Sequence, residues 1–157
     1  MEVVYKANDT VTPEEMQSLE ESVGFGPHRN VQRNATALAG SLFVATARCD
    51  AQLVGMVRLV GDGAYILHIA GLSVHPNFQS KGIGRKLMEM AVAFAKETNV
   101  GSGDDFGEFT LFANTGSAVF YEKLGFSLTP NGMVLVDTEF RRKQELEFQE
   151  GWKKKRE

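Results

Sequence analysis

The chain has 157 residues, of which 43% are hydrophobic and 10% aromatic, and a formal net charge of -3. This length and composition favour one compact domain with a sizeable core and exclude a disordered or fibrous chain. The slightly negative charge excludes an overall basic surface of the kind that binds nucleic acid.

The sequence indicates neither a disulfide nor a targeting segment. Cys49 is the only cysteine, and the N-terminal residues lack a positively charged start followed by an apolar run. No stretch approaches the roughly 18 consecutive apolar residues of a membrane span. We therefore expect a reducing, cytoplasmic compartment and no membrane contact.

The first predicted elements are a short strand and two helices. Val3–Tyr5 is strand-like, and Thr12–Glu15 predicts a helix start, with an N-cap hydroxyl, a proline in the first turn and two carboxylates at the positive end of the helix dipole. This helix should end near Gly24. After a loop at residues 24–28, Val31–Leu38 is weakly periodic and could form a second short helix.

Three strands are predicted next. Leu42–Cys49, Leu53–Val60 and Tyr65–Val74 are strand-like, and turn residues at 50–51 and 61–63 separate them. Consecutive strands joined by short turns predict an antiparallel arrangement.

A longer helix should follow the glycines at 82 and 84. Its apolar residues recur with the helical period and precede the turn-rich residues 101–105; they are Ile83, Leu87, Met90, Ala91 and Phe94. One face of this helix is therefore expected to be buried.

The last third of the chain is predicted to hold a strand, a short helix, a hairpin and a tail. The strand is Phe109–Ala113, and the helix is Ser117–Leu124, closed by Gly125. The hairpin would join Phe126–Leu128 to Met133–Val136 around residues 130–132, and Asp137–Lys155 would form a charged, helical, solvated extension.

The glycine turn carries the clearest chemical signal. A strand that ends at Val74 and a helix that opens at Gly82 would expose unpaired main-chain N–H groups where the helix dipole is positive. Gly82 and Gly84 lack Cβ atoms, so an anion such as phosphate could approach the main chain, and Lys81 and Arg85 add positive charge. Alternatively, the glycines only permit a sharp turn and close packing. Neither a dinucleotide-binding fingerprint nor a P-loop fits these residues.

Two motifs resemble those of the GNAT superfamily of acyl-CoA-dependent N-acetyltransferases. Gln79-Ser80-Lys81-Gly82-Ile83-Gly84 matches the family signature Gln/Arg-x-x-Gly-x-Gly/Ala, and Leu72–Pro76 before it is similar to the family's strand end and Pro turn. Residues 114–126, which begin at Asn114 and end in Phe-Tyr-x-x-x-Gly-Phe, are similar to the second family block. The resemblance is strong over residues 53–136, weaker over 1–52 and absent after Asp137.

The resemblance implies a single α+β domain over residues 1–157. It would contain a mixed, mostly antiparallel sheet of about six or seven strands flanked by about four helices, with a C-terminal helical extension. Residues 1–52 would form the variable substrate side, 53–136 the acetyl-CoA-binding core and 137–157 the charged extension.

The resemblance also implies the residues that bind acetyl-CoA. The main chain of the glycine turn would hold the pyrophosphate, and the end of the preceding strand would pair with the pantetheine as an added strand. Asn114 and Tyr121 would complete the site, although Asn114 could instead cap the helix that begins at Ser117. The expected binding residues are Leu72, Ser73, Val74, Gln79, Ser80, Lys81, Gly82, Ile83, Gly84, Arg85, Asn114 and Tyr121.

The implied chemistry is direct attack of an amine on the thioester. A backbone N–H near Val74 would stabilise the oxyanion. Tyr121 would be the general acid, because the reference pKa of tyrosine, about 10, lies above the roughly 8.5 of a thiol. A half-buried packing role for Tyr121 is the alternative. Many relatives carry Asp or Glu near the strand position of Ala70 and Gly71, which leaves His68 or a water chain as the general base.

These residues predict an N-acetyltransferase that transfers the acetyl group of acetyl-CoA to a primary amine of a small molecule or peptide. A non-catalytic acyl-CoA-binding regulatory module is the alternative. We expect no metal, no nucleic-acid partner and no membrane contact, and a homodimer is compatible with the sequence. The acceptor itself is not indicated by any cluster of residues.

Overall fold

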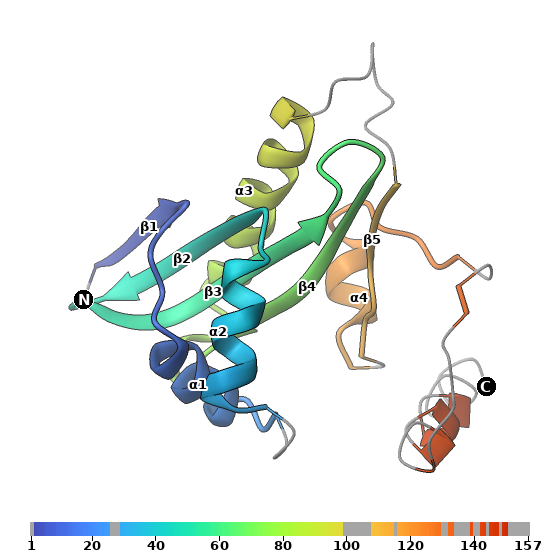
Figure 1. The fold of residues 1–157 in the computed structure, drawn as a ribbon, viewed down its shortest axis with the longest axis horizontal. Coiled ribbons are helices and arrows are strands. Elements are labelled where there is room, and N and C mark those ends of the chain that lie inside the picture. The colour runs from blue at the N-terminus through green and yellow to red at the C-terminus, as the bar shows by residue number, and fades with distance from the viewer. Residues whose placement is uncertain are drawn as a thin grey trace. The chain divides into compact units, whose positions relative to one another are not determined.

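The computed structural model describes residues 2–25, 29–98, 108–114 and 116–129, and single positions or pairs and triplets between 132 and 150. These residues fall into two compact units, 1–111 and 112–157, and each is described by itself. The first unit contains a sheet and three α-helices, and the second contains the short helix α4 and helical positions between 139 and 150 (Figure 1).

The elements follow the predicted order closely. They are β1 Val3–Ala7, α1 Pro13–Ser22, α2 Val31–Ala39, β2 Phe43–Cys49, β3 Gln52–Gly61, β4 Ile66–Val74, the 3-10 turn η1 Pro76–Phe78, α3 Ile83–Thr98, β5 Glu108–Leu111 and α4 Ala118–Glu122. Every helix and strand predicted up to residue 122 is therefore confirmed, with boundaries that differ by a few residues. The glycine-rich residues 101–105 lie outside the described part of the chain.

The sheet is mixed and mostly antiparallel, as expected. Its strands lie in the order β1-β2-β3-β4-β5, and only the β4–β5 pair is parallel. Asp50 and Ala51 both adopt a positive φ, 48° and 68°, which is the backbone of the tight turn predicted between β2 and β3.

The predicted strand number and the last hairpin are not confirmed. The described residues form five strands instead of six or seven. Residues 126–129 lie in no strand, so the first arm of the hairpin is not formed there, while 130–131 and 134–136 lie outside the described residues. In the expected extension, positions 139, 142–143, 145–147 and 149–150 are helical, and residues 151–157 are outside the description.

Local sequence explains where α1 begins. The Thr12 hydroxyl accepts a hydrogen bond from the Glu15 amide at 3.1 Å, and the Glu15 carboxylate accepts one from the Thr12 amide at 2.9 Å. This capping box satisfies two main-chain N–H groups that the helix leaves unpaired. The Glu15 carboxylate also contacts Arg48 of β2 at 2.6 Å, so the start of α1 is attached to the sheet.

The helices cover opposite faces of the sheet (Figure 1). On one face, Met16 and Leu19 of α1 join Leu53 and Met56 of β3 in a buried cluster. On the other face, Phe94 of α3 stacks on Phe43 of β2 with ring centroids 4.5 Å apart. The sheet is therefore the central layer of the first unit.

Gly55 of β3 makes room for the first turns of α3. A Cβ atom at this position would lie 3.0 Å from Cγ2 of Ile83 and 3.1 Å from Cδ1 of Leu87. Both side chains are fully buried, with 2% and 0% of their surface exposed. The absence of a side chain at Gly55 thus lets the start of α3 lie directly on the sheet.

Candidate functional site

β4 contains a bulge just before the segment predicted to bind the cofactor. Leu59 of β3 pairs with Ile69 and the adjacent Arg58 pairs with Gly71, so Ala70 is an extra residue without a partner on β3. The bulge lies directly before Gly71, and a glycine within an apolar strand often marks such a site. Ala70 and Gly71 are also the positions at which a carboxylate was expected from the resemblance.

One side of β4 is left without a strand partner beyond this bulge. The parallel pairing with β5 covers Ile66–Ile69 and stops at the pair Ile69 and Leu111. The described residues provide no further strand on that side. The main chain after the bulge, up to Val74, is therefore paired through β3 alone.

The pairing pattern identifies which main-chain groups face this open side. His75 donates its N–H to the carbonyl of Val54 at 2.9 Å, which makes Val74 and Gly55 a non-hydrogen-bonded pair. Because hydrogen-bonded and non-hydrogen-bonded pairs alternate, the N–H and C=O groups of Val74 and Leu72 point away from β3, whereas those of Ser73 point toward it. Leu72 and Val74 thus present main-chain groups to an added strand.

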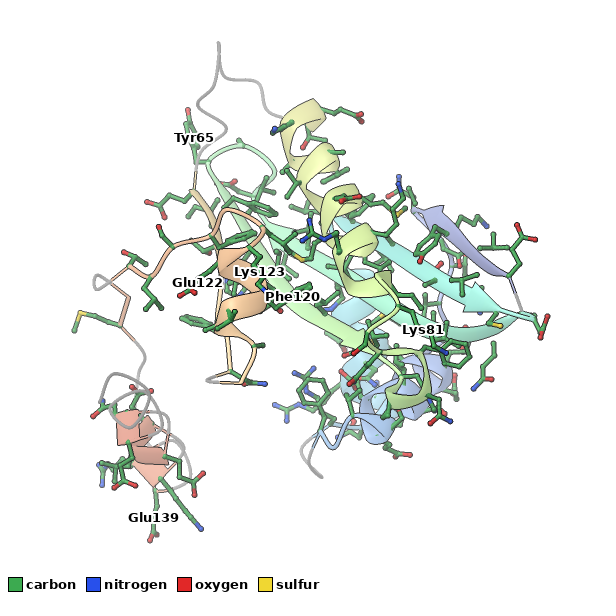
Figure 2. All side chains as sticks on the ribbon, turned by 180° about the vertical axis from the view of Figure 1, so that it is seen from behind. Tyr65, Lys81, Phe120, Glu122, Lys123 and Glu139 are labelled. Carbon is green, nitrogen blue, oxygen red and sulfur yellow. The ribbon has the colours of Figure 1, made fainter. Side chains whose placement is uncertain are left out.

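The turn after β4 is held by side chains of the predicted motif. Gln79 Nε2 donates to the carbonyl of Val74 at 2.9 Å, which ties the start of the motif to the end of the strand. Lys81 lies beside this turn (Figure 2), where its Nζ donates to the carbonyl of Asn77 at 3.0 Å and lies 5.2 Å from the centre of the Phe78 ring. Gln79 therefore positions the turn, and Lys81 supplies an exposed positive charge next to it.

Gly82 is required by the backbone at the start of α3. Its φ is +82°, and nothing lies within 4 Å of a Cβ built there, so the conformation and not the available space favours glycine. The Gly82 carbonyl accepts the hydrogen bond of the Lys86 amide at 3.0 Å, which makes Gly82 the N-cap. The N–H groups of Ile83, Gly84 and Arg85 have no preceding carbonyl within the helix and form an anion site at the positive end of α3.

Gly84 has a different role from Gly82. It lies inside α3, and its φ is not among the positive values in this turn, which belong to Ser80 at 60° and Gly82 at 82°. No backbone strain requires a glycine at this position. Close packing and a close approach of a ligand to the first turn of α3 are the two physical reasons that are left for Gly84.

His68 lies on β4, before the bulge, and contacts β5. Its Nδ1 is 2.9 Å from the hydroxyl of Thr110, which is its register partner on that strand. The side chain is half-buried, and burial, with a smaller contribution from the charge of Arg58, holds its pKa below the ordinary value of histidine. At neutral pH the imidazole is therefore neutral and can accept a proton.

The second unit contains the other two predicted site residues. In α4 and the turn after it, Tyr121 packs edge-on against Phe120 and Phe126, with ring centroids 5.1 Å and 6.1 Å away. Burial raises the pKa of Tyr121, so its hydroxyl keeps its proton at neutral pH. Figure 2 shows Phe120 and Glu122 of α4, and Lys123 directly after the end of that helix.

The hydrogen bonds of Asn114 to other described residues use its main chain. Its carbonyl accepts hydrogen bonds from the amide of Ser117 at 2.9 Å and from the Ser117 hydroxyl at 3.0 Å. Neither bond involves the Asn114 side chain, so the helix-capping alternative for that side chain is not realised.

The predicted residues thus form two groups. In the first unit, Leu72–Val74 and Gln79–Arg85 are contiguous in space, because Gln79 bonds to Val74, and His68 lies upstream on the same strand. Asn114 and Tyr121 lie together in the second unit. Sequence reasoning missed Thr110, Gly55 and Arg58. Only Arg58 could have been singled out from the sequence, because it is the one charged residue in the apolar stretch Leu53–Val60.

The part of the chain that the structure describes contains neither a helix that could cross a membrane nor a cluster of metal ligands. None of its helices is both long and apolar enough to cross a membrane. Nor do its His, Cys, Asp and Glu side chains form a cluster of three or more that could hold a metal ion.

Comparisons with known proteins agree with this geometry. The sequence model of the acetyltransferase (GNAT) domain matches residues 39–128. The chain is 28% identical to histone acetyltransferase TAP1 of Glycine max over 84% of this chain and 59% of that protein. It is 30% identical to the chloroplastic serotonin N-acetyltransferase 2 of Oryza sativa over 71% of this chain and 54% of that protein.

A solved structure shows the same fold. A GNAT family acetyltransferase from Streptococcus pneumoniae superimposes with a TM-score of 0.72 and 28% identity, and the match covers 88% of this chain and 100% of that one. The curated relatives above are longer, since the chain spans only 59% and 54% of their length.

The two glycines of the turn should respond differently to alanine. Gly82→Ala should lower the melting temperature and weaken coenzyme A binding about 5- to 30-fold, because a left-handed alanine costs about 1–2 kcal/mol. Gly84→Ala should raise the melting temperature, since alanine is favoured in a helix by about 1 kcal/mol, yet it should also weaken binding because its methyl group blocks the ligand. Scanning calorimetry of both variants measures the melting temperature, and titration calorimetry measures the affinity for coenzyme A. Unchanged affinity in Gly84→Ala would contradict a close approach of phosphate to α3.

Proposed function

Because the chain belongs to the GNAT acetyltransferases, we propose that it transfers the acetyl group of acetyl-CoA to a primary amine of a small molecule or peptide. The observation that carries this proposal is the open side of β4, which leads directly into the glycine turn at the start of α3. One curated relative is named for a histone acceptor and another for serotonin, so the comparisons support an amine acceptor of either size.

The residues of the first unit fit acetyl-CoA as a co-substrate. We assign the pyrophosphate to the main chain of Gln79–Arg85, where Gly82 leaves the helix N–H groups accessible. Lys81 would leave the Asn77 carbonyl to reach a phosphate. The outward N–H and C=O groups of Leu72, with the N–H of Val74, would bond to the amides of the pantetheine. These contacts would account for the pyrophosphate and for the pantetheine amides.

The reaction requires two proton transfers. The amine nitrogen forms a bond to the thioester carbonyl carbon, the carbon–sulfur bond breaks, and the products are an amide and the free thiol of coenzyme A. The amine must lose one proton to a base, and the departing thiolate must gain one from an acid. The Val74 N–H is the donor we assign to the carbonyl oxygen as it becomes negative.

Tyr121 and His68 are the groups we assign to these transfers. The raised pKa of Tyr121 keeps the phenol protonated until the thiolate leaves. The lowered pKa of His68 keeps the imidazole neutral, and when Nδ1 donates to Thr110, Nε2 is the basic nitrogen. No carboxylate is needed at Ala70 or Gly71 in this assignment.

The proposed function is tested by thiol release from acetyl-CoA in the presence of small amines, amino acids and peptides. We expect at least one amine to raise the release of thiol above hydrolysis by water, and mass spectrometry should detect the acetylated product. If acetyl-CoA binds but no amine accelerates thiol release, the regulatory acyl-CoA-binding alternative replaces the enzyme.

Replacement of Tyr121 by Phe should lower kcat by about 10²- to 10⁴-fold while the affinity for acetyl-CoA changes little, because only the proton donor is removed. Steady-state kinetics and acetyl-CoA calorimetry measure the two effects. Phe120→Leu is the matched control, since it alters the ring next to Tyr121 without removing a hydroxyl. An unchanged kcat in a variant whose chemical step limits turnover rules out the acid assignment.

His68→Gln should remove the acidic limb from the pH profile of kcat/KM. The wild-type rate should rise with pH through an apparent pKa below about 6.5, the ordinary value for histidine, because the folded protein stabilises the neutral base. Thr110→Val should keep the acidic limb but shift its apparent pKa, since the His68 ring loses only the hydrogen bond at Nδ1. An acidic limb that survives in His68→Gln would assign the base to a water chain instead.

A further inference from the structure

Arg58 is a charged residue in the middle of the sheet. It lies on β3 between the fully buried Val57 and Leu59, and only 8% of its own surface is exposed. Its guanidinium reaches α2, so it lies on the face of the sheet that α1 and α2 cover. A cation in this position needs partners that replace the water it has lost.

The hydrogen bonds of this guanidinium to the described residues use one nitrogen. Nη1 donates to the carbonyl of Ala37 at 3.2 Å and to the hydroxyl of Ser41 at 3.4 Å, both at the C-terminal end of α2. Nε is buried and has no hydrogen-bond partner among the residues that the structure describes. Capping of α2 therefore explains Nη1, whereas the buried Nε has no partner within the described part of the fold.

Among the described residues, no carboxylate forms an ion pair with Arg58, although the charge of Glu20 acts to raise the pKa of Arg58. The carboxylate whose charge acts on Arg58 is that of Glu20. It forms an ion pair with Arg29 at 2.8 Å and accepts a hydrogen bond from the Asn34 amide at 2.9 Å. Burial, and then repulsion by Arg29, lowers the pKa of Arg58. A buried cation without a counter-ion destabilises the protein by several kcal/mol, and a bound anion would offset this.

The sheet register places Arg58 close to the proposed base. Val60 pairs with His68, and Arg58 lies two residues from Val60 on the same face of β3. Arg58 and His68 are thus diagonal neighbours, which lie about 7–8 Å apart across a pair of strands. Because Nε of Arg58 is buried, the Arg58 side chain must shift before one small ligand can contact both side chains.

We propose that the Nε–Nη2 edge of Arg58 binds a carboxylate of the acceptor, so that the acceptors are amines that carry a carboxylate near the amino group, as α-amino acids do. This inference rests on the proposed function. The side-on edge of a guanidinium matches the two oxygens of a carboxylate in a bidentate pair. Such a pair would satisfy Nε, neutralise Arg58 and leave the amino group near His68.

The first test uses the unmodified protein and matched acceptors. Several α-amino acids are compared with their own carboxamides, which keep the amine but lose the negative charge. We expect kcat/KM to be about 10- to 100-fold higher for the acids, the range of a hydrogen bond to a charged group. Equal values for acids and amides, or acetylation of amines but of no amino acid, overturn the inference and leave the N-acetyltransferase intact. If no amine of any kind raises thiol release, the result refutes the proposed function instead.

The second test assigns the preference to Arg58. Arg58→Lys keeps a cation but cannot form the bidentate pair, so the ratio of kcat/KM for acid to amide should fall toward one, while the KM for acetyl-CoA changes little. Arg33→Gln is the matched control, because it removes a positive charge from an exposed position on α2 and should leave the ratio unchanged. A ratio that is unchanged in folded Arg58→Lys overturns the inference. If that variant does not fold, the comparison of acids with amides in the unmodified protein still decides the question.

Discussion

The start of α3 lies where it does because Gly55 has no side chain. Ile83 and Leu87 occupy the space that a Cβ at Gly55 would need, and both are buried. This contact fixes the N-terminus of α3 against the middle of the sheet, next to the end of β4. The anion site at Gly82 and the open main chain of Leu72 and Val74 depend on that placement, since each is useful only beside the other.

The bulge at Ala70 has a second structural effect. An extra residue on β4 increases the local twist, and β5 stops pairing with β4 at the residue before it. The same extra residue shifts the alternation by one position, so that Ser73 faces β3 and Leu72 and Val74 face the open side. A single inserted residue thus converts an ordinary strand into one that can accept a ligand along its edge.

Much of this arrangement could be predicted from the sequence. Thr12 and Glu15 determine the start of α1, and the turn at Asp50 and Ala51 joins two strands as expected, because these features depend on neighbouring residues. The residues that contact Arg58 and Gly55 could not be predicted, since these contacting residues lie far away in the sequence, in or next to helices. The apolar residues Phe126 and Leu128 misled the prediction of a hairpin, because an alternating pattern does not show whether a partner strand exists. The placement of Gly82 was predictable, but the left-handed backbone that requires it was not.

The hydrogen bond from Gln79 to the carbonyl of Val74 has a consequence for how far a ligand can slide along β4. Of the four outward main-chain groups at Leu72 and Val74, this bond occupies one acceptor and leaves two donors and one acceptor. A ligand displaced by two residues toward the turn would face the occupied carbonyl and lose a hydrogen bond. In the proposed complex, Gln79 would therefore limit how far the ligand extends along β4, and with it the position of the reacting carbonyl.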